Sequence, residues 1–318
     1  MIRTLRPTDI VAYLGFRSKA GHNEALLRPG DSPSKSSLRG FLSRSLSLDP
    51  RRESWLQIQD GRIDGLVGAR SRLGTDIWDI DQLISATHQR GGQVYANLLR
   101  HLITAAGEEG VQKVFLRAML QSPAVESARL TGFYQYAVER VYRLPCLRPY
   151  PHSPVFPLRP RRRADHHALF HLYCSVVPVV VRQVEGMTLQ EWRWTEGWGL
   201  RPPVNWRVDL PRTRRDFVLD RESGLGAWLQ IRAGARSIMT LMRVEEEPDA
   251  REMIRFALNQ LRQGKTVYFP VREYQSFLEP ILREEGFELI AEQALLARAL
   301  AIRVYEPKLL PIRAHMSR

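Results

Sequence analysis

Two glycines and two aspartates in the first third of the chain stand where they could do chemistry. The stretch HQRGGQV at residues 88–94 lies between an expected strand and an expected helix. A glycine-containing turn that opens a helix presents unpaired N–H groups to an anion, and the helix dipole adds to the attraction. Arg90 can add charge-assisted contacts. The stretch therefore predicts a phosphate site other than a P-loop, since no Gly-Lys-Ser/Thr ending follows, with a plain tight turn as the alternative.

Asp79 and Asp81 lie on the strand expected just before this stretch, so their carboxylates stand near the predicted phosphate site. A carboxylate that acts as a general base needs a raised pKa or a water relay. The alternative for both side chains is solvent exposure or an ion pair with a nearby arginine. The spacing alone leaves these two interpretations open.

The glycines and aspartates need a sheet to position them. Residues 54–58 and 65–71 are expected to form two strands joined by a turn at Asp60-Gly61. Residues 76–85 form a third expected strand. If side chains alternate strictly along this third strand, one face carries Ile77, Asp79, Asp81 and Leu83.

The hydrophobic period then changes from that of a strand to that of a helix. Apolar residues recur at helical spacing over 94–106, and residues 111–116 are expected to form a buried strand. Ser122-Pro123 begins a second helix with a cap and a proline at the first position. Residues 133–144 supply a last strand. This order predicts an α/β fold (α+β in that the sheet is mixed), with helices flanking the sheet.

Landmarks of the first half recur in the second at an offset of about 155 residues. The matched pairs, in the same order along the chain, are RPTD at 6–9 with RAD at 163–165, VFLR at 114–117 with FPVR at 269–272, and Gly132-Phe133 with Gly286-Phe287. Three ordered matches indicate that one domain occurs twice.

A proline-rich stretch separates the two halves. Each proline removes a backbone donor and fixes φ, so neither a helix nor a central strand can persist there. The expected organisation is a first domain over residues 1–144, a Pro/Arg-rich linker over 145–162 and a second domain over 163–318.

The stretch Gln89-Arg90-Gly91-Gly92-Gln93-Val94 resembles the Gln/Arg-x-x-Gly-x-Gly/Ala motif of the GNAT-type N-acetyltransferases. It stands in that family's usual place, between the fourth strand and the long third helix. Gly132-Phe133 resembles the Gly-Phe that enters the family's final strands. The likeness spans residues 1–144, with a weaker echo over 163–305. It implies two tandem GNAT-like domains, each a mixed, mostly antiparallel sheet flanked by helices.

The resemblance implies acetyl-CoA as cosubstrate and no metal. The pantetheine arm would enter a V-shaped opening between the strands at 79–85 and 111–116, and backbone N–H groups of residues 90–94 would hold the pyrophosphate. The expected cofactor-binding residues are Leu83, Ile84, Gln89, Arg90, Gly91, Gly92, Gln93 and Val94.

The resemblance also implies transfer of an acetyl group to the amine of a small molecule or peptide. Asp79 or Asp81 would serve as the base. The tyrosine that often protonates the departing thiolate corresponds to Ala128, so Tyr134 or Tyr136 would have to substitute. Positioning alone can carry much of such chemistry.

The second half differs where the first has its glycines. The acidic run Glu245-Glu246-Glu247-Pro248-Asp249 would repel a pyrophosphate, so this half is expected to pack against the first and shape the acceptor pocket. Its four clustered tryptophans fit a packed core or a stacking surface. These tryptophans are Trp192, Trp194, Trp198 and Trp206.

Bulk composition adds one unusual property, a net charge of +13 that is carried almost entirely by arginine. Such a surface attracts nucleic acid, anionic membranes or phosphorylated molecules without distinction, and compositional bias explains it equally well. No apolar run approaches the ~20 residues of a membrane helix. We expect a cytoplasmic protein. Two other function classes stay open: a non-catalytic GNAT-like binding or scaffold protein, and a nucleic-acid-binding protein.

Overall fold

The computed structural model describes residues 1–26, 52–72, 76–86, 91–147, 157–185, 214–234 and 236–300. The strands of the first half are β1 (Ile2–Thr4), β2 (Arg52–Gln59), β3 (Arg62–Ser71), β4 (Ile77–Ser85), β5 (Lys113–Met119) and β6 (Tyr134–Leu144). Its helices are the 3₁₀ turn η1 (Pro7–Asp9), α1 (Ile10–Lys19), α3 (Gly91–Glu108) and α4 (Pro123–Leu130). The strands and helices expected over residues 54–144 are confirmed, with boundaries shifted by a few residues.

The second half has the strands β7 (Leu158–Pro160), β8 (Arg214–Arg221), β9 (Gly224–Arg232), β10 (Ser237–Met242), β11 (Val267–Arg272) and β12 (Glu288–Ala299). Its helices are η2 (Arg163–Asp165), α5 (His166–Val176), α6 (Val179–Glu185), η4 (Val244–Glu246), α8 (Glu247–Asn259), η5 (Glu273–Gln275) and α9 (Leu278–Glu284). In both halves a short strand and a 3₁₀ turn precede the first helix.

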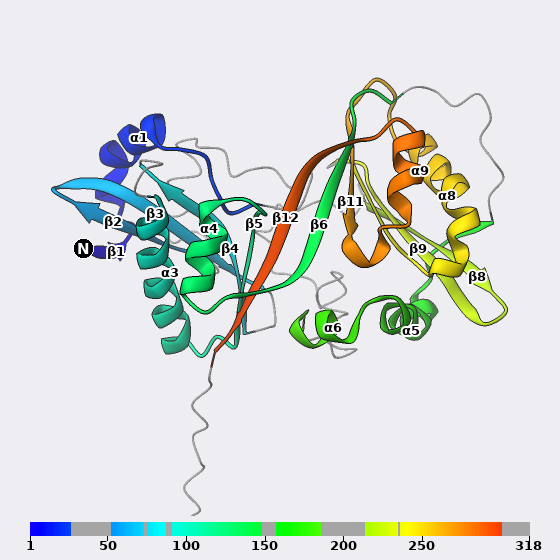
Figure 1. Ribbon diagram of the computed structural model, residues 1–318, viewed down its shortest axis with the longest axis horizontal. Helices are drawn as coiled ribbons and strands as arrows, with labels where there is room; N and C mark the ends of the chain where they lie inside the picture. Colours follow the sequence, from blue (N-terminus) through cyan, green and yellow to red (C-terminus); the bar gives the residue numbers. More distant parts are fainter. Residues whose placement is uncertain are drawn as a thin grey trace, which may run out of the picture.

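All the described strands belong to one sheet, in the order β1-β2-β3-β4-β5-β12-β6-β11-β10-β9-β8-β7. The sheet is mixed and mostly antiparallel, and helices flank it, as the sequence predicts. Among the described strands, parallel pairing occurs between β4 and β5 and between β10 and β11. Figure 1 shows β12 and β6 running side by side through the middle of the molecule.

The sequence did not indicate how the halves join. Strand β12, the last strand in the described residues, lies between β5 and β6 of the first half, and β6 in turn lies between β12 and β11 of the second. Each half therefore completes its sheet with a strand from the other. The domain boundaries at 144 and 163 remain a prediction, and part of the linker lies outside the described residues.

An arginine–aspartate pair anchors the start of both halves. Arg3 donates two hydrogen bonds to Asp9, at 2.7 and 2.6 Å, and Arg159 donates two to Asp165, at 2.7 and 2.8 Å. Each aspartate also accepts the backbone N–H three residues before it. These matched contacts place RPTD and RAD in the same local structure.

Separate apolar cores lie on the two faces of the sheet. Helices α3 and α4 cover one face of the first half with a core that includes Leu98, Leu99 and Leu102. Helix α1 covers the opposite face through Tyr13 and Phe16. In the second half, α8 and α9 build one core and α5 another. Figure 1 shows these helix groups at the two ends of the long sheet.

The expected alternation along β4 is wrong beyond Ile80. The pairing of β3 with β4 shifts so that Gly68 faces Gln82 and Ala69 faces Ile80, which leaves Asp81 as an extra residue. A bulge of this kind moves all later side chains to the other face. Leu83 consequently joins Trp78 and Ile80 in the core under α3, whereas Ile84 packs toward α1.

The two Gly-Phe landmarks have the same backbone role. Gly132 follows α4 with φ +84°, and Gly286 follows α9 with φ +85°. This left-handed region suits glycine at the end of a helix. The phenylalanines that follow, Phe133 and Phe287, are both buried in the cores.

Candidate active site

The parallel strands β4 and β5 separate partway along their length. They pair at three positions, of which the last joins Asp79 to Phe115, although β4 continues to Ser85 and β5 to Met119. The bulge at Asp81 comes just beyond this last pair. Strands that part in this way turn N–H and C=O groups of both edges toward a V-shaped opening, where those groups need other partners.

Helix α3 begins at Gly91, a few residues after β4 ends at Ser85. Gly91 is buried against the ring of Tyr95, to which a Cβ would approach within 3.3 Å. Gly92 is exposed, and its carbonyl accepts a hydrogen bond of 2.9 Å from Ser127 Oγ of α4. The first N–H groups of a helix have no intrahelical partner, so this end of α3 suits an anion.

Of the remaining residues expected in the phosphate loop, the structure describes two, Gln93 and Val94. Gln93 is exposed. Val94 is buried in the core under α3 and lies against Gly65, where a Cβ would collide with it. Gln89 and Arg90 lie outside the described residues.

The backbone edge of β4 in the opening is hydrogen-bonded to residues 21–26, which we call the strap. Glu24 N–H donates to Leu83 O at 2.9 Å. The side chain of Asn23 accepts from Leu83 N–H at 2.8 Å and donates to Asp81 O at 2.9 Å. The strap therefore uses both backbone groups of Leu83, one of the residues expected to bind cofactor.

The strap reaches both sides of the V. Gly21 N–H donates to Ser85 O on β4 at 3.2 Å, and Leu26 N–H donates to Arg117 O on β5 at 2.7 Å. Ala25 is 2% exposed and belongs to the core under α3. The opening between the two strands is thus filled by the chain's own backbone in this structure.

Glu24 fixes the strap to the helices around the opening. Its carboxylate accepts a hydrogen bond of 2.6 Å from the hydroxyl of Ser122, the residue that caps α4. Burial raises the pKa of the Tyr95 hydroxyl to about 12, and the charge of Glu24 adds to the rise. An acidic group therefore lies between the first turns of α3 and α4.

Both candidate bases form ion pairs with arginine. The carboxylate of Asp79 accepts hydrogen bonds of 2.7 and 2.6 Å from the guanidinium of Arg72. Asp81 is 5% exposed and pairs with Arg52. An ion pair favours the charged carboxylate, so a proton taken up at either site has to compete with its arginine.

The two candidate acids have different surroundings. Tyr134 is 46% exposed at the start of β6. Tyr136 contacts Phe115 edge-on at 5.9 Å between ring centroids. Burial raises the pKa of the Tyr136 hydroxyl to about 12, so this phenol keeps its proton at neutral pH. Tyr136 thus lies next to the strand that carries one side of the V, whereas Tyr134 faces solvent.

Comparison with known proteins supports the fold through solved structures. No protein-family model and no curated protein sequence matches the chain. A GCN5-related N-acetyltransferase from Sphaerobacter thermophilus superposes with a TM-score of 0.55 at 14% identity, over 94% of this chain and 95% of that one. The chain has the GNAT fold. A tandem GNAT protein from the clavulanic acid biosynthesis pathway is also similar, with a TM-score of 0.49 at 13% identity over 94% of this chain and 98% of that one.

The position that the family resemblance assigns to an acid carries no ionisable side chain here. Ala128, where the resemblance implied a tyrosine, is fully buried in α4 against the sheet. Such a site has no room for a phenol without displacing the core. The phenol that the resemblance implied is therefore absent from this position of α4.

Sequence reasoning missed a buried polar cluster next to Tyr136. The carboxylate of Glu139 is 3% exposed and pairs with Arg117 of β5 and with Arg272 of β11, the latter at 2.9 Å. Arg272 also reaches Glu185 at 3.3 Å. The sequence signal that could have found this cluster is the repeat, which aligns Arg117 with Arg272 in otherwise apolar strands.

The corresponding opening of the second half is built differently. Strands β10 and β11 pair at a single position, Ser237 with Tyr268. At the start of α8, Arg221 binds both Glu246 and Asp249, so the acidic run is partly neutralised within the protein. Carboxylates stand here where the first half presents glycine.

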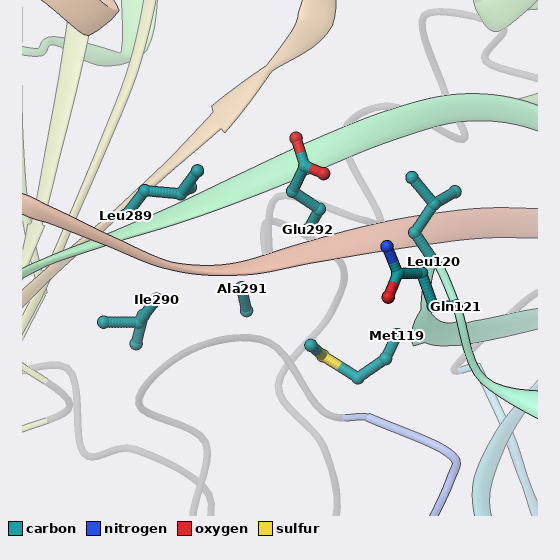
Figure 2. A pocket seen from close by; sticks show the side chains of 7 residues that line it. All are labelled: Met119, Leu120, Gln121, Leu289, Ile290, Ala291 and Glu292. Atoms are coloured by element: carbon teal, nitrogen blue, oxygen red, sulfur yellow. The ribbon is translucent and has the colours of Figure 1, made fainter.

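A shallow groove of about 290 Å³ lies between the end of β5 and the start of β12. Figure 2 shows its lining residues, among which the apolar side chains of Met119 and Ile290 are each about two-fifths exposed. The polar members are Gln121 and Glu292. The groove therefore belongs to the exposed surface around the end of β5.

Two further observations concern the rest of the chain. The tryptophans at 192, 194, 198 and 206 lie outside the described residues. None of the helices in the described part of the chain is long and apolar enough to cross a bilayer.

Proposed function

We propose that this protein is an acyl-CoA-dependent N-acyltransferase whose first half binds acetyl-CoA and transfers the acetyl group to an amine. The observation that carries the proposal is the parting of the parallel strands β4 and β5 at a bulge, followed by a helix that opens with Gly91 and Gly92. The pantetheine arm would follow the edge of β4 at Leu83 and Ile84. The pyrophosphate would lie at residues 89–94.

In the proposed reaction the amine nitrogen attacks the thioester carbonyl carbon, the C–S bond breaks and the thiolate leaves. A base removes the proton from the attacking nitrogen, and an acid protonates the thiolate. Asp79 or Asp81 would act as the base after loosening its ion pair with arginine. Tyr136, which holds its proton at neutral pH, is the better placed acid, and Tyr134 the poorer.

The second half would shape the acceptor pocket. Val184 of α6 packs against Phe115 of β5 and Ile77 of β4, and Lys113 Nζ donates to Gln183 O at 3.4 Å. These contacts place α6 over the strands that carry Asp79. We further propose that the two halves are tandem copies of one domain, with boundaries at 1–144 and 163–318.

A thermal-shift titration with acetyl-CoA tests the cofactor site, because a ligand that binds the folded state alone raises the melting temperature. Gly92→Glu adds a carboxylate at the exposed first turn of α3, which favours the helix dipole but repels a pyrophosphate. The matched control Gly92→Gln has the same bulk without the charge. We expect at least tenfold weaker binding for Gly92→Glu than for Gly92→Gln.

The proposal would be abandoned if the natural chain showed no shift at millimolar acetyl-CoA, or if Gly92→Glu and the natural chain shifted equally. A positive result leads directly to a screen of amines, in which the free thiol of the CoA released from acetyl-CoA is the readout.

A non-catalytic binding or scaffold protein is the second candidate. The strap that fills the opening and the arginine partners of Asp79 and Asp81 favour it. This candidate predicts that acetyl-CoA leaves the melting temperature unchanged in the natural chain and in every variant of the opening.

A further inference from the structure

The strap uses the groups that a pantetheine arm would need. A pantetheine arm is an extended chain with two amides, and it binds a strand edge through backbone N–H and C=O groups. On β4 the strap already takes Leu83 N–H, Leu83 O and Asp81 O, through Asn23 and Glu24. Arm and strap therefore cannot occupy this edge together.

The strap also fills the volume of the opening. Ala25 lies in the core under α3, and the Glu24 carboxylate is bound to Ser122 between α3 and α4. A diphosphate arriving at the first turn of α3 would meet this carboxylate, and like charges at close range repel. Both the shape and the charge of the strap oppose the ligand.

Resting on the function proposed above, we infer that residues 21–26 are an internal competitor of acetyl-CoA, which closes the thioester groove until the ligand displaces it. The way the strap joins helix α1 allows such a movement. Helix α1 ends just before it, with Ala20 N–H bonded to Phe16 O at 2.7 Å. The strap can therefore leave while α1 stays packed on the sheet.

Competition of this kind lowers the apparent affinity by the fraction of molecules whose groove is open. Weakening the strap should raise that fraction. Asn23 is the most informative residue, since its side chain makes three hydrogen bonds: to Leu83 N–H, to Asp81 O and, at 3.3 Å, to Ala25 N–H. Their loss favours the open groove.

The test is isothermal titration with CoA of the full-length natural chain, Asn23→Ala and the control His22→Ala. His22 lies in the same segment but its side chain is exposed. We expect Asn23→Ala to bind CoA about tenfold more tightly than the natural chain, and His22→Ala to bind within twofold of it. Equal dissociation constants for Asn23→Ala and the natural chain would overturn the inference and leave the proposed function standing.

Amide hydrogen exchange of the natural chain gives a second readout that needs no variant. On adding CoA, the amides of Glu24 and Leu26 should lose protection while those of α3 keep theirs. Binding of CoA with the protection of Glu24 and Leu26 unchanged would refute the strap's role. If the natural chain binds no CoA at millimolar concentration, the proposed function fails, and the inference fails with it.

Discussion

At the scale of single residues, the centre of the sheet depends on the carboxylate of Glu139. Arg117 reaches it from β5 and Arg272 from β11, so one buried charge is shared by guanidinium groups of both halves. Gln293, which faces Glu139 across the β6–β12 pair, accepts a further hydrogen bond of 3.3 Å from Arg117. The cluster therefore couples the two halves by charge as well as by the backbone ladder.

Glu139→Gln should destabilise the protein by about 3 kcal/mol, because it leaves buried arginines without their shared counter-charge. Urea unfolding at neutral pH measures the loss. The control Glu288→Gln removes an exposed partner of Arg143 and should change the free energy of unfolding by less than about 1 kcal/mol. Similar losses for the two variants would contradict the central role of Glu139.

At the scale of elements, the end of α3 meets the start of β2 through two acidic residues. Burial raises the pKa of the Glu53 carboxyl to about 7, and a hydrogen bond with Glu109 adds to the rise. In the unfolded chain the carboxyl of Glu53 has its ordinary pKa of 4.5. Folding is therefore favoured below the unfolded pKa, and this contribution is lost as the pH rises through the folded pKa.

Glu53→Gln should abolish this dependence. We expect the variant to melt at a higher temperature than the natural chain above pH 7 and to lose that advantage as the pH falls toward 4.5. Melting curves across this range test the expectation, with the exposed Glu126→Gln as control. A constant difference between Glu53→Gln and the natural chain at all pH values would count against a shifted carboxyl.

Local sequence patterns predicted the helices and strands better than they predicted the contacts between them. Helical spacing located α3, and the Ser122-Pro123 pair located the start of α4 with its cap. The bulge at Asp81 was missed because alternation assumes an unbroken period of two. The strap was missed for another reason: its hydrogen bonds join residues about 60 positions apart, which no local pattern encodes.

The sequence predicted the strands and the glycines of the candidate site, but not the charged partners of its two aspartates. The sequence placed Asp79 and Asp81 on β4 but left their partners open. Arg72 and Arg52 reach them from the ends of β3 and β2, a proximity that follows from sheet register. The position of β12 was equally hidden, since its alternation is the same whichever strands flank it.

At the scale of the whole molecule, the continuous sheet makes the halves interdependent. Ala294 and Leu296 of β12 lie in the core under α3, although they come from the far end of the chain. Many arginines are engaged inside this framework, in pairs such as Arg3–Asp9, Arg159–Asp165 and Arg251–Glu284. Each such pair also takes up one carboxylate, so this pairing leaves the net charge of +13 unchanged.

Residues 1–156 expressed alone should fail to fold, because β5 and β6 would lose β12 between them and expose unpaired strand edges. Co-expression with residues 157–318 should restore a one-to-one complex that elutes with the intact chain in gel filtration. The full chain cut by a protease site inserted in the linker serves as the control and should stay assembled. Cooperative unfolding of the isolated 1–156 fragment would contradict this.

The central Glu139–Gln293 pairing also has a consequence for how such a protein can diversify. Two identical chains meeting about a twofold axis would have to place the same side chain on both central strands, so any substitution there would act twice. A single polypeptide removes that constraint, and an acid can face an amide. The covalent joining of the halves thus lets each side of the centre vary independently.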